Sequence, residues 1–340
     1  MGLIFIMKKN IKLIVINLIA LLVILITIDI FSAYKDYKFM CNYIKEASST
    51  VGFQQEENPC PDFEYRFGLI SFKNFWKNEE KEFERDINRN IVVENAEKDK
   101  KSILVFGCSF AKGTNPDYKG NLNYVLNKYT GRTIYNRAFN GFGPAPMLWQ
   151  VRNEKFYDGI KNEPEYILYV FVTYQPERII PEKWGNSSSR PIYVGYNEKD
   201  GKLVENKSPL LLLCRFNFMK KLIINHYNEQ YYTEGGKEKL FNLFKLHLLE
   251  SKAVLEKKYP NAKFIIIKYP MGSDTLREEA QFFYETELWN DFEKSGFKVY
   301  DLKDEIKVDL TDKEYLLPDL HPNQKAWELV IPQFVKDLKL

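Results

Sequence analysis

The sequence predicts an α/β fold built on a parallel sheet, and three features lead to this expectation. From Lys101 onward, apolar runs alternate with stretches of helical period. Two of the runs, Ile167–Val170 and Ile265–Ile267, are continuously apolar, which is typical of strands covered on both faces. Asn261 and Gly296 fall in short connections that return to strands. Because strands and helices alternate, we expect parallel strands with right-handed crossovers.

The pattern places each element within residues 100–340. The expected strands are Ile103–Phe106, Thr133–Phe139, Tyr166–Val172, Lys263–Tyr269 and Lys298–Leu302. The expected helices are Asn121–Tyr129, Met147–Tyr157, Lys237–Lys258, Leu276–Lys294 and a last one over residues 324–338. Pro332 falls inside the last helix, and we expect it to kink that helix.

Residues 179–235 interrupt the alternation as one long insertion. They contain an expected hairpin, with strands at 192–194 and 202–204 joined through residues 197–201. An insertion of this length inside an α/β core is usually functional. We expect it to cover the active site and select the substrate, and a passive decoration is the alternative.

The N-terminal part of the chain predicts a single-pass membrane protein. Leu13–Ile28 is almost uninterrupted apolar sequence, and the apolar segment extends over residues 13–33, about the length that a bilayer-spanning helix needs. Three lysines in residues 1–12 favour a cytoplasmic N-terminus, and residues 34–99 are expected to form a stalk. A cleaved signal peptide is the alternative. Either reading places the catalytic part of the chain outside the cytoplasm.

Composition excludes several classes of protein. A net charge of +3 over 340 residues does not favour nucleic acid as a partner. The four cysteines show no spacing typical of a metal site. No motif of the chain implies a metal ion or an organic cofactor. Cys41 and Cys60 could pair in an oxidising compartment, although the sequence does not fix their connectivity.

A serine follows the first expected strand directly. Gly107-Cys108-Ser109 comes straight after Ile103–Phe106, with a helix-forming stretch soon after. This order places the Ser109 hydroxyl at the carboxyl edge of the sheet, where open α/β folds bind ligands. We expect Cys108 to be a small buried apolar residue below that edge.

The best candidate for the base is His321, one of only three histidines in the chain. It lies in a loop before the last helix, and such loops often carry catalytic groups. His226 falls in the insertion, and His247 is expected on the surface or boundary of a helix. Asp319, two residues before His321, could hold the imidazole tautomer. A nucleophile, a base and an acid are the parts of a hydrolytic triad, whose order in the chain varies.

A second loop offers donors for an oxyanion. Asn140 and Gly141 follow the strand expected over 133–139, so they arrive at the same sheet edge. Gly141 allows a close approach of the backbone to a ligand. The backbone N–H of Ser109 would be the other donor.

These segments together resemble a known family. Gly107–Phe110, Asn136–Gly143 and Asp319–Pro322 are similar, in this order, to sequence blocks of the SGNH hydrolases, also called GDSL esterases and lipases. The resemblance covers about residues 100–340. It implies a flavodoxin-like, three-layer α/β/α fold with about five parallel strands. It also implies that Ser109 is the nucleophile, Gly141 the second-block glycine and His321 the base.

The chain departs from the family pattern in three places. Cys108 replaces the usual Asp beside the serine, and the third-block Asn is missing, so that Gln175 is the expected substitute as an amide donor. The Asp-x-His spacing resembles that of membrane-associated proteins of polysaccharide O-acetylation, which allows for a membrane acyltransferase as a partner. Asp319 is then the acid or the site is a Ser–His dyad, with Asp312 and Glu314 as further candidates for the acid.

The leading hypothesis is a membrane-anchored, extracytoplasmic serine esterase of the SGNH type. Its substrate would be an acylated carbohydrate of the cell envelope or another ester, with O-acetyl groups foremost, cleaved through an acyl-Ser109 intermediate. An O-acyltransferase that uses the same serine is the first alternative. A catalytically silent SGNH-like protein that binds glycan or scaffolds a complex is the second.

Overall fold

The computed structural model describes residues 16–21, 23–28, 30, 91–98, 100–113, 118–179, 195–199, 202–206, 235–271, 278–318 and 320–340. Residues 16–21 and 23–28 are helical. Among the described residues, no helix is both long and apolar enough to cross a bilayer. The anchor over residues 13–33 stays a prediction. The predicted cytoplasmic N-terminus, most of the stalk and the Cys41–Cys60 pair lie outside the described residues.

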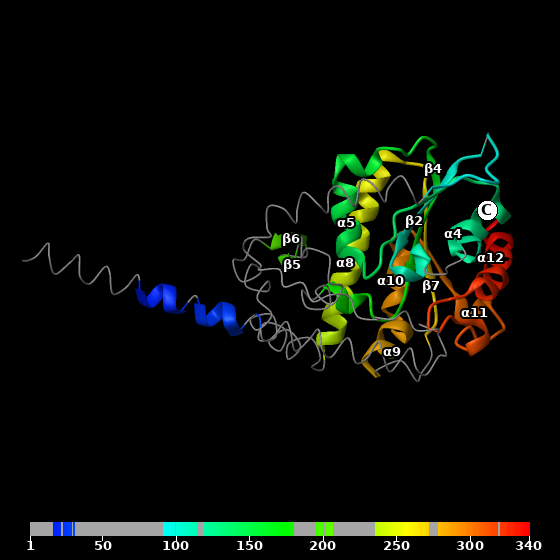
Figure 1. Ribbon diagram of the computed structural model, residues 1–340. Coiled ribbons are helices and arrows are strands. Elements are labelled where there is room, and N and C mark those ends of the chain that lie inside the picture. The colour runs from blue at the N-terminus through cyan, green and yellow to red at the C-terminus, as the bar shows by residue number, and fades with distance from the viewer. Residues whose placement is uncertain are drawn as a thin grey trace, which may run out of the picture. The chain divides into compact units, whose positions relative to one another are not determined.

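The main sheet of the described part of the chain has six strands (Figure 1). Across the sheet, the strands are β1 (Ile91–Val92), β3 (Ile134–Asn136), β2 (Ser102–Gly107), β4 (Pro164–Phe171), β7 (Lys263–Lys268) and β8 (Phe297–Asp301). All pair in parallel except β1, which runs antiparallel beside β3. Numbered along the chain, the five parallel strands lie in the flavodoxin-like order 2-1-3-4-5. The order reverses between β2 and β4, and ligands bind at the carboxyl ends of the strands beside such a switch point.

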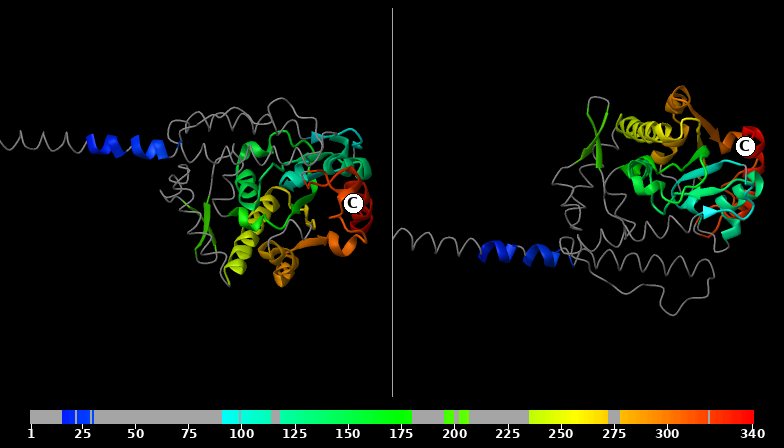
Figure 2. Two further views of the ribbon diagram at one scale, coloured as in Figure 1. Left: turned by 60° about the horizontal axis from the view of Figure 1, so that its bottom comes forward. Right: turned by 90° about the horizontal axis from the view of Figure 1, so that it is seen from above.

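Helices cover both faces of the sheet, in the three-layer arrangement that the sequence predicts (Figures 1 and 2). One core cluster joins the sheet to α5 (Pro144–Arg152), α8 (Gly236–Lys258), α9 (Glu278–Glu285) and α10 (Asn290–Lys294). The other joins it to α4 (Leu122–Thr130), α11 (Leu302–Glu305) and α12 (Gln324–Leu338). Along β2, Leu104 and Phe106 belong to the first cluster, whereas Ile103 and Val105 belong to the second. Since successive side chains of a strand point to opposite faces, a strand covered twice must be apolar throughout.

The third strand in chain order is shorter than predicted. It was expected over residues 133–139, but β3 ends at Asn136. The Asn136 side chain accepts the N–H of Ala138 (2.9 Å), while the N–H groups of Arg137 and Phe139 still donate to carbonyls of β2. Pro332 lies inside α12, which runs as one helix over its expected span.

Two expected helices are broken by 3-10 turns. The helix expected over residues 147–157 starts earlier, as α5, and gives way to η2 (Glu154–Tyr157). The helix expected over residues 276–294 is divided into α9 and α10. The division occurs because the Thr286 hydroxyl accepts a backbone N–H and caps the 3-10 turn η5 (Glu287–Trp289).

A hairpin is present in the insertion as predicted, but its first strand lies later in the chain than residues 192–194, which are outside the described residues. β5 (Gly195–Lys199) pairs antiparallel with β6 (Lys202–Asn206). Residues 197–199, predicted as loop, belong to β5, and Lys199 pairs with Lys202 of β6. Most of the rest of the insertion lies outside the described residues, and its predicted role over the site stays a prediction.

Candidate active site

The first loop of the site follows β2. Gly107 ends this strand with a φ of 139°, and a Cβ atom at this position would lie 2.9 Å from the Val170 carbonyl oxygen of β4. Only glycine fits such a backbone. Cys108 is fully buried, as expected, and precedes the short helix α3 (Ser109–Lys112). Ser109 therefore begins a helix at the carboxyl edge of β2, beside the switch point between β2 and β4.

The structure brings His321 to Ser109 from 212 residues away in the chain. His321 Nε2 and Ser109 Oγ are 2.6 Å apart, within hydrogen-bond distance. The imidazole packs on Phe110, with ring centroids 4.9 Å apart, and Phe110 packs on Tyr269 after β7 (5.4 Å). A hydroxyl bonded to an oriented imidazole can act as a nucleophile, because the imidazole can accept its proton.

The loop that carries His321 is fixed by its own hydrogen bonds. The N–H of Leu317 donates to the His321 carbonyl (2.7 Å), and Leu320 adopts a φ of 66°, which few non-glycine residues do. Asn323 caps α12 with its side-chain oxygen, and its amide nitrogen donates to the Glu314 carbonyl (2.7 Å). These contacts set where the imidazole lies relative to α12.

The acid partner of the predicted triad stays a prediction. Asp319 lies outside the described residues. Asp312 and Glu314 belong to the same loop and are both exposed. The acid of a hydrolytic triad is typically buried behind the imidazole, so exposure disfavours these two alternatives.

The second loop is a type II turn over residues Phe139–Phe142. The N–H of Phe142 donates to the Phe139 carbonyl (3.1 Å), and Gly141 has the φ of 76° that the third position of this turn requires. Asn140 is the exposed second residue. The N–H of Phe139 donates to the Gly107 carbonyl (3.3 Å), which joins this turn to the first loop. The Gly141 N–H takes no part in the turn's own hydrogen bond, so it can serve a ligand.

Two buried asparagines support the site and were not predicted. The Asn123 side chain donates to the Ala111 carbonyl (2.8 Å), and that of Asn136 donates to the Lys112 carbonyl (3.1 Å). The last carbonyls of a helix lack partners within the helix, so these amides hold α3 in place. In the sequence, Asn123 and Asn136 stand out only as polar residues within segments whose pattern is otherwise apolar.

The structure does not favour Gln175 as a donor to an oxyanion, and that role stays a prediction. Gln175 is fully buried, and its Nε2 donates to the Val170 carbonyl (3.0 Å). Its Oε1 accepts the N–H of Val172 (3.4 Å). The amide thus satisfies backbone groups where β4 ends and the ladder no longer pairs them. Gln175 fixes the turn that leads into the 3-10 helix η3 (Pro176–Ile179).

His247 lies away from the dyad and is not the surface residue that the sequence predicts. It is fully buried in α8, and its Nδ1 lies 2.7 Å from the Leu243 carbonyl. Burial lowers the pKa of His247 to about 4, because the charged imidazole loses its water. His226 lies outside the described residues.

Comparison with known proteins identifies similar solved structures. No family model matches the chain, and neither does any curated protein. A member of the lipolytic protein G-D-S-L family from Veillonella parvula is 11% identical, with a TM-score of 0.43, and the match covers 71% of this chain and 99% of that one. A carbohydrate esterase family 2 enzyme from Corynascus thermopiles is 14% identical, with a TM-score of 0.37 and coverage of 72% and 68%.

A third similar structure is an acetyl xylan esterase from Butyrivibrio proteoclasticus. It is 14% identical, with a TM-score of 0.38, and the match covers 71% of this chain and 64% of that one. The structural neighbours are thus lipolytic G-D-S-L proteins and carbohydrate esterases at low identity. The functional argument below rests on the geometry of this chain's own residues.

Proposed function

We propose that this protein is a serine esterase that forms an acyl-Ser109 intermediate. The observation that carries the proposal is the 2.6 Å separation of His321 Nε2 and Ser109 Oγ. Two further features support it: Ser109 starts a helix at the switch point of the sheet, and the Gly141 turn is hydrogen-bonded to the same loop. The contact between the two side chains also counts against a silent scaffold.

The reaction follows from these positions. His321 Nε2 takes the Ser109 proton while Oγ attacks the ester carbonyl, and the N–H groups of Ser109 and Gly141 bind the oxyanion that forms. The imidazolium then gives its proton to the departing alkoxide, which leaves an acyl-serine. Water, deprotonated by His321, releases the acid and restores the serine. In this proposal, Asp319 orients the imidazole and Asn140 contacts the substrate.

Substrate and location are proposed from the sequence. The apolar segment over residues 13–33 after three lysines supports an anchored protein whose catalytic domain lies outside the cytoplasm. O-acyl groups of envelope carbohydrate, O-acetyl above all, are the ester class that such a position would meet. If a sugar hydroxyl replaced water as acceptor, the same serine would make the protein an O-acyltransferase.

Ester turnover by two serine variants tests the proposal. Ser109→Ala should lower kcat/KM for an acetyl ester by about 10³-fold or more, because the covalent route is lost. Ser102→Ala is the matched control. Its hydroxyl donates to the Asn162 carbonyl (2.7 Å) at the opposite end of the same strand, so turnover should stay at the wild-type rate. Unchanged turnover in Ser109→Ala would refute the proposal.

A second measurement separates hydrolysis from transfer. The burst of leaving group from an activated acetyl ester is followed by a steady rate that reports deacylation. An esterase should keep that rate when an oligosaccharide is added. An acyltransferase should accelerate and yield acetylated sugar.

A further inference from the structure

The second loop has to supply an accurately placed donor. The Gln175 amide is hydrogen-bonded to the backbone at the end of β4. The remaining candidate donor to the oxyanion beside Ser109 is therefore the Gly141 N–H, in the turn over residues 139–142. A donor of this kind acts only if it points at the developing oxyanion, and a shift of about 1 Å can cost a factor of about 100 in rate. Whatever holds this turn still therefore matters to the reaction.

Arg178, on η3, contacts the turn directly. Its Nη1 donates to the Phe142 carbonyl at 2.7 Å. The backbones also approach closely, because a Cβ on Gly143 would lie 3.1 Å from the Arg178 Cβ. The peptide after Gly141-Phe142 is thus held by a charge-assisted hydrogen bond, roughly twice as strong as a neutral one.

The guanidinium is itself held in place. It lies over the Tyr174 ring, with its central carbon 4.3 Å from the ring centroid. The N–H of Arg178 donates to the Gln175 carbonyl (3.1 Å), and Ile179 beside it is buried in the core. The turn that Gln175 fixes thereby sets the position of Arg178. The Arg178 side chain is therefore already ordered before it bonds to the Phe142 carbonyl.

Tyr174 connects the same guanidinium to the nucleophile's loop. Burial and the neighbouring Cys108 thiol raise the pKa of the Tyr174 phenol, and the nearby Arg178 charge opposes this. The phenol therefore lies near enough to both the Cys108 thiol and the Arg178 guanidinium for each to shift its pKa. Cys108 immediately precedes Ser109, so Tyr174 lies between the Arg178 guanidinium and the loop that carries the nucleophile.

We propose that Arg178 is a positioning residue that holds the turn over residues 139–142 against the Ser109 loop and aims the Gly141 N–H at the oxyanion. This inference rests on the proposed esterase function. It assigns Arg178 no contact with the substrate: the residue acts through the Phe142 carbonyl. Its loss should slow the chemical step while leaving substrate binding nearly intact.

Three arginine variants test this, with kcat and KM measured separately on an acetyl ester and folding followed by thermal unfolding. Arg178→Ala should lower kcat by about 10- to 100-fold with KM within about threefold of wild type. Arg178→Lys keeps one donor and the charge, so it should recover part of the loss. Arg152→Ala is the matched control, because Arg152 ends α5 and pairs with Glu250 on the surface. Its kcat should be unchanged.

The outcomes separate this inference from the function it rests on. If Ser109→Ala abolishes turnover but folded Arg178→Ala keeps kcat within about twofold of wild type, the positioning role is wrong and the esterase stands. A loss confined to KM, or to thermal stability with kcat per folded protein retained, likewise contradicts it. If Arg178→Ala does not fold, the kcat of Arg178→Lys decides: a reduced kcat supports the role and a wild-type kcat overturns it. If Ser109→Ala keeps turnover, the esterase itself fails.

Discussion

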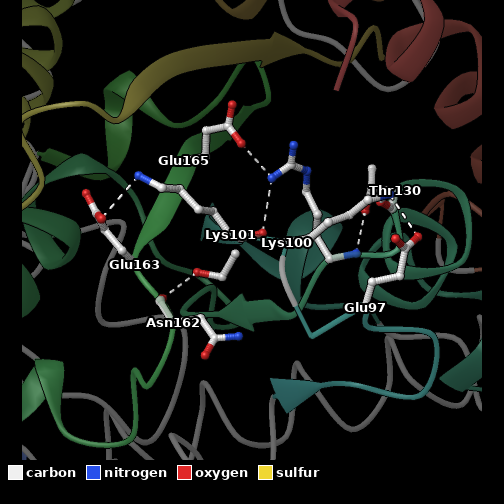
Figure 3. Close-up of polar contacts among 9 residues, drawn as sticks. Glu97, Lys100, Lys101, Thr130, Asn162, Glu163 and Glu165 are labelled. Carbon is white, nitrogen blue, oxygen red and sulfur yellow. Dashed lines mark hydrogen bonds and ion pairs between the residues drawn. The ribbon is translucent and has the colours of Figure 1, made fainter.

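The two ends of strands β2, β3 and β4 carry opposite kinds of chemistry. At the amino ends, long charged side chains pair with one another (Figure 3): Arg132 with Glu165 (2.6 Å), and Lys101 with Glu163 (3.1 Å). At the carboxyl ends, a short hydroxyl meets an imidazole, Ser109 with His321, on loops fixed by backbone hydrogen bonds.

The difference shows what each end can do. Charged side chains that are already paired with each other attract a charged ligand only weakly. Exposed ion pairs also contribute only about 0–1 kcal/mol to stability. A buried serine bonded to a histidine has no charge to neutralise and keeps a proton that can move. Variants at the carboxyl edge should therefore change the rate, whereas variants at the amino edge should change stability slightly.

The largest expected effect is the loss of the base. His321→Ala should lower kcat/KM for an acetyl ester by about 10³-fold, because Ser109 then has no group to take its proton. His247→Gln is the control: it removes a histidine from α8, away from the dyad, and should keep the wild-type kcat. If both variants keep it, the carboxyl edge is not the reaction centre.

The next effect concerns stability alone. His247 has a folded pKa of about 4, below the ordinary value near 6.5, so the unfolded chain binds more protons between these pH values. Stability should therefore fall by up to about 3 kcal/mol as the pH is lowered from 6.5 to 4. Urea unfolding at a series of pH values measures this. His247→Gln should lose that part of the pH dependence, and an unchanged slope would show that another group is responsible.

A smaller effect is expected at the turn before the nucleophile. Gly107→Ala should destabilise the protein by about 2 kcal/mol, since φ is 139° and the new Cβ meets the Val170 carbonyl at 2.9 Å. Gly235→Ala is the control, because Gly235 also has a positive φ, 81°, but no atom within 4 Å of the added Cβ. Thermal unfolding of both should show the larger loss for Gly107→Ala. Equal losses would mean that the close contact with β4 costs nothing.

The smallest effect belongs to the amino edge. Lys101→Ala removes a pair with Glu163 in which both side chains are more than 40% exposed. Stability should change by less than about 1 kcal/mol, and kcat should not change. A substantial drop in kcat would remove the contrast between the two edges.

Much of this could be predicted from the sequence where a local pattern was decisive. The continuous apolar run of β2, the glycine after it and the loop before α12 each have a local cause, and they located Ser109 and His321. The break between α9 and α10 was missed because one hydroxyl cap, Thr286, outweighed an apolar period that continued across it.

Contacts between distant segments could not be predicted in this way. The chemistry of the Gln175 amide favours a role as an oxyanion donor. In the structure, that amide is instead hydrogen-bonded to the Val170 carbonyl and the Val172 N–H at the end of β4. Arg178 had no signal at all, since its role depends on a carbonyl 36 residues away. His247 was expected at a surface or boundary, because a histidine in an amphipathic helix does not reveal how deep that helix lies.

The most direct test of the central claim is to find which residue a serine-reactive label modifies. The protein is treated with a fluorophosphonate, which reacts with activated serines, and the modified peptide is identified by mass spectrometry. Our account predicts one adduct, on Ser109, formed far more slowly in His321→Ala and absent in Ser109→Ala. An adduct on another residue, or labelling that persists at the wild-type rate in His321→Ala, would contradict it.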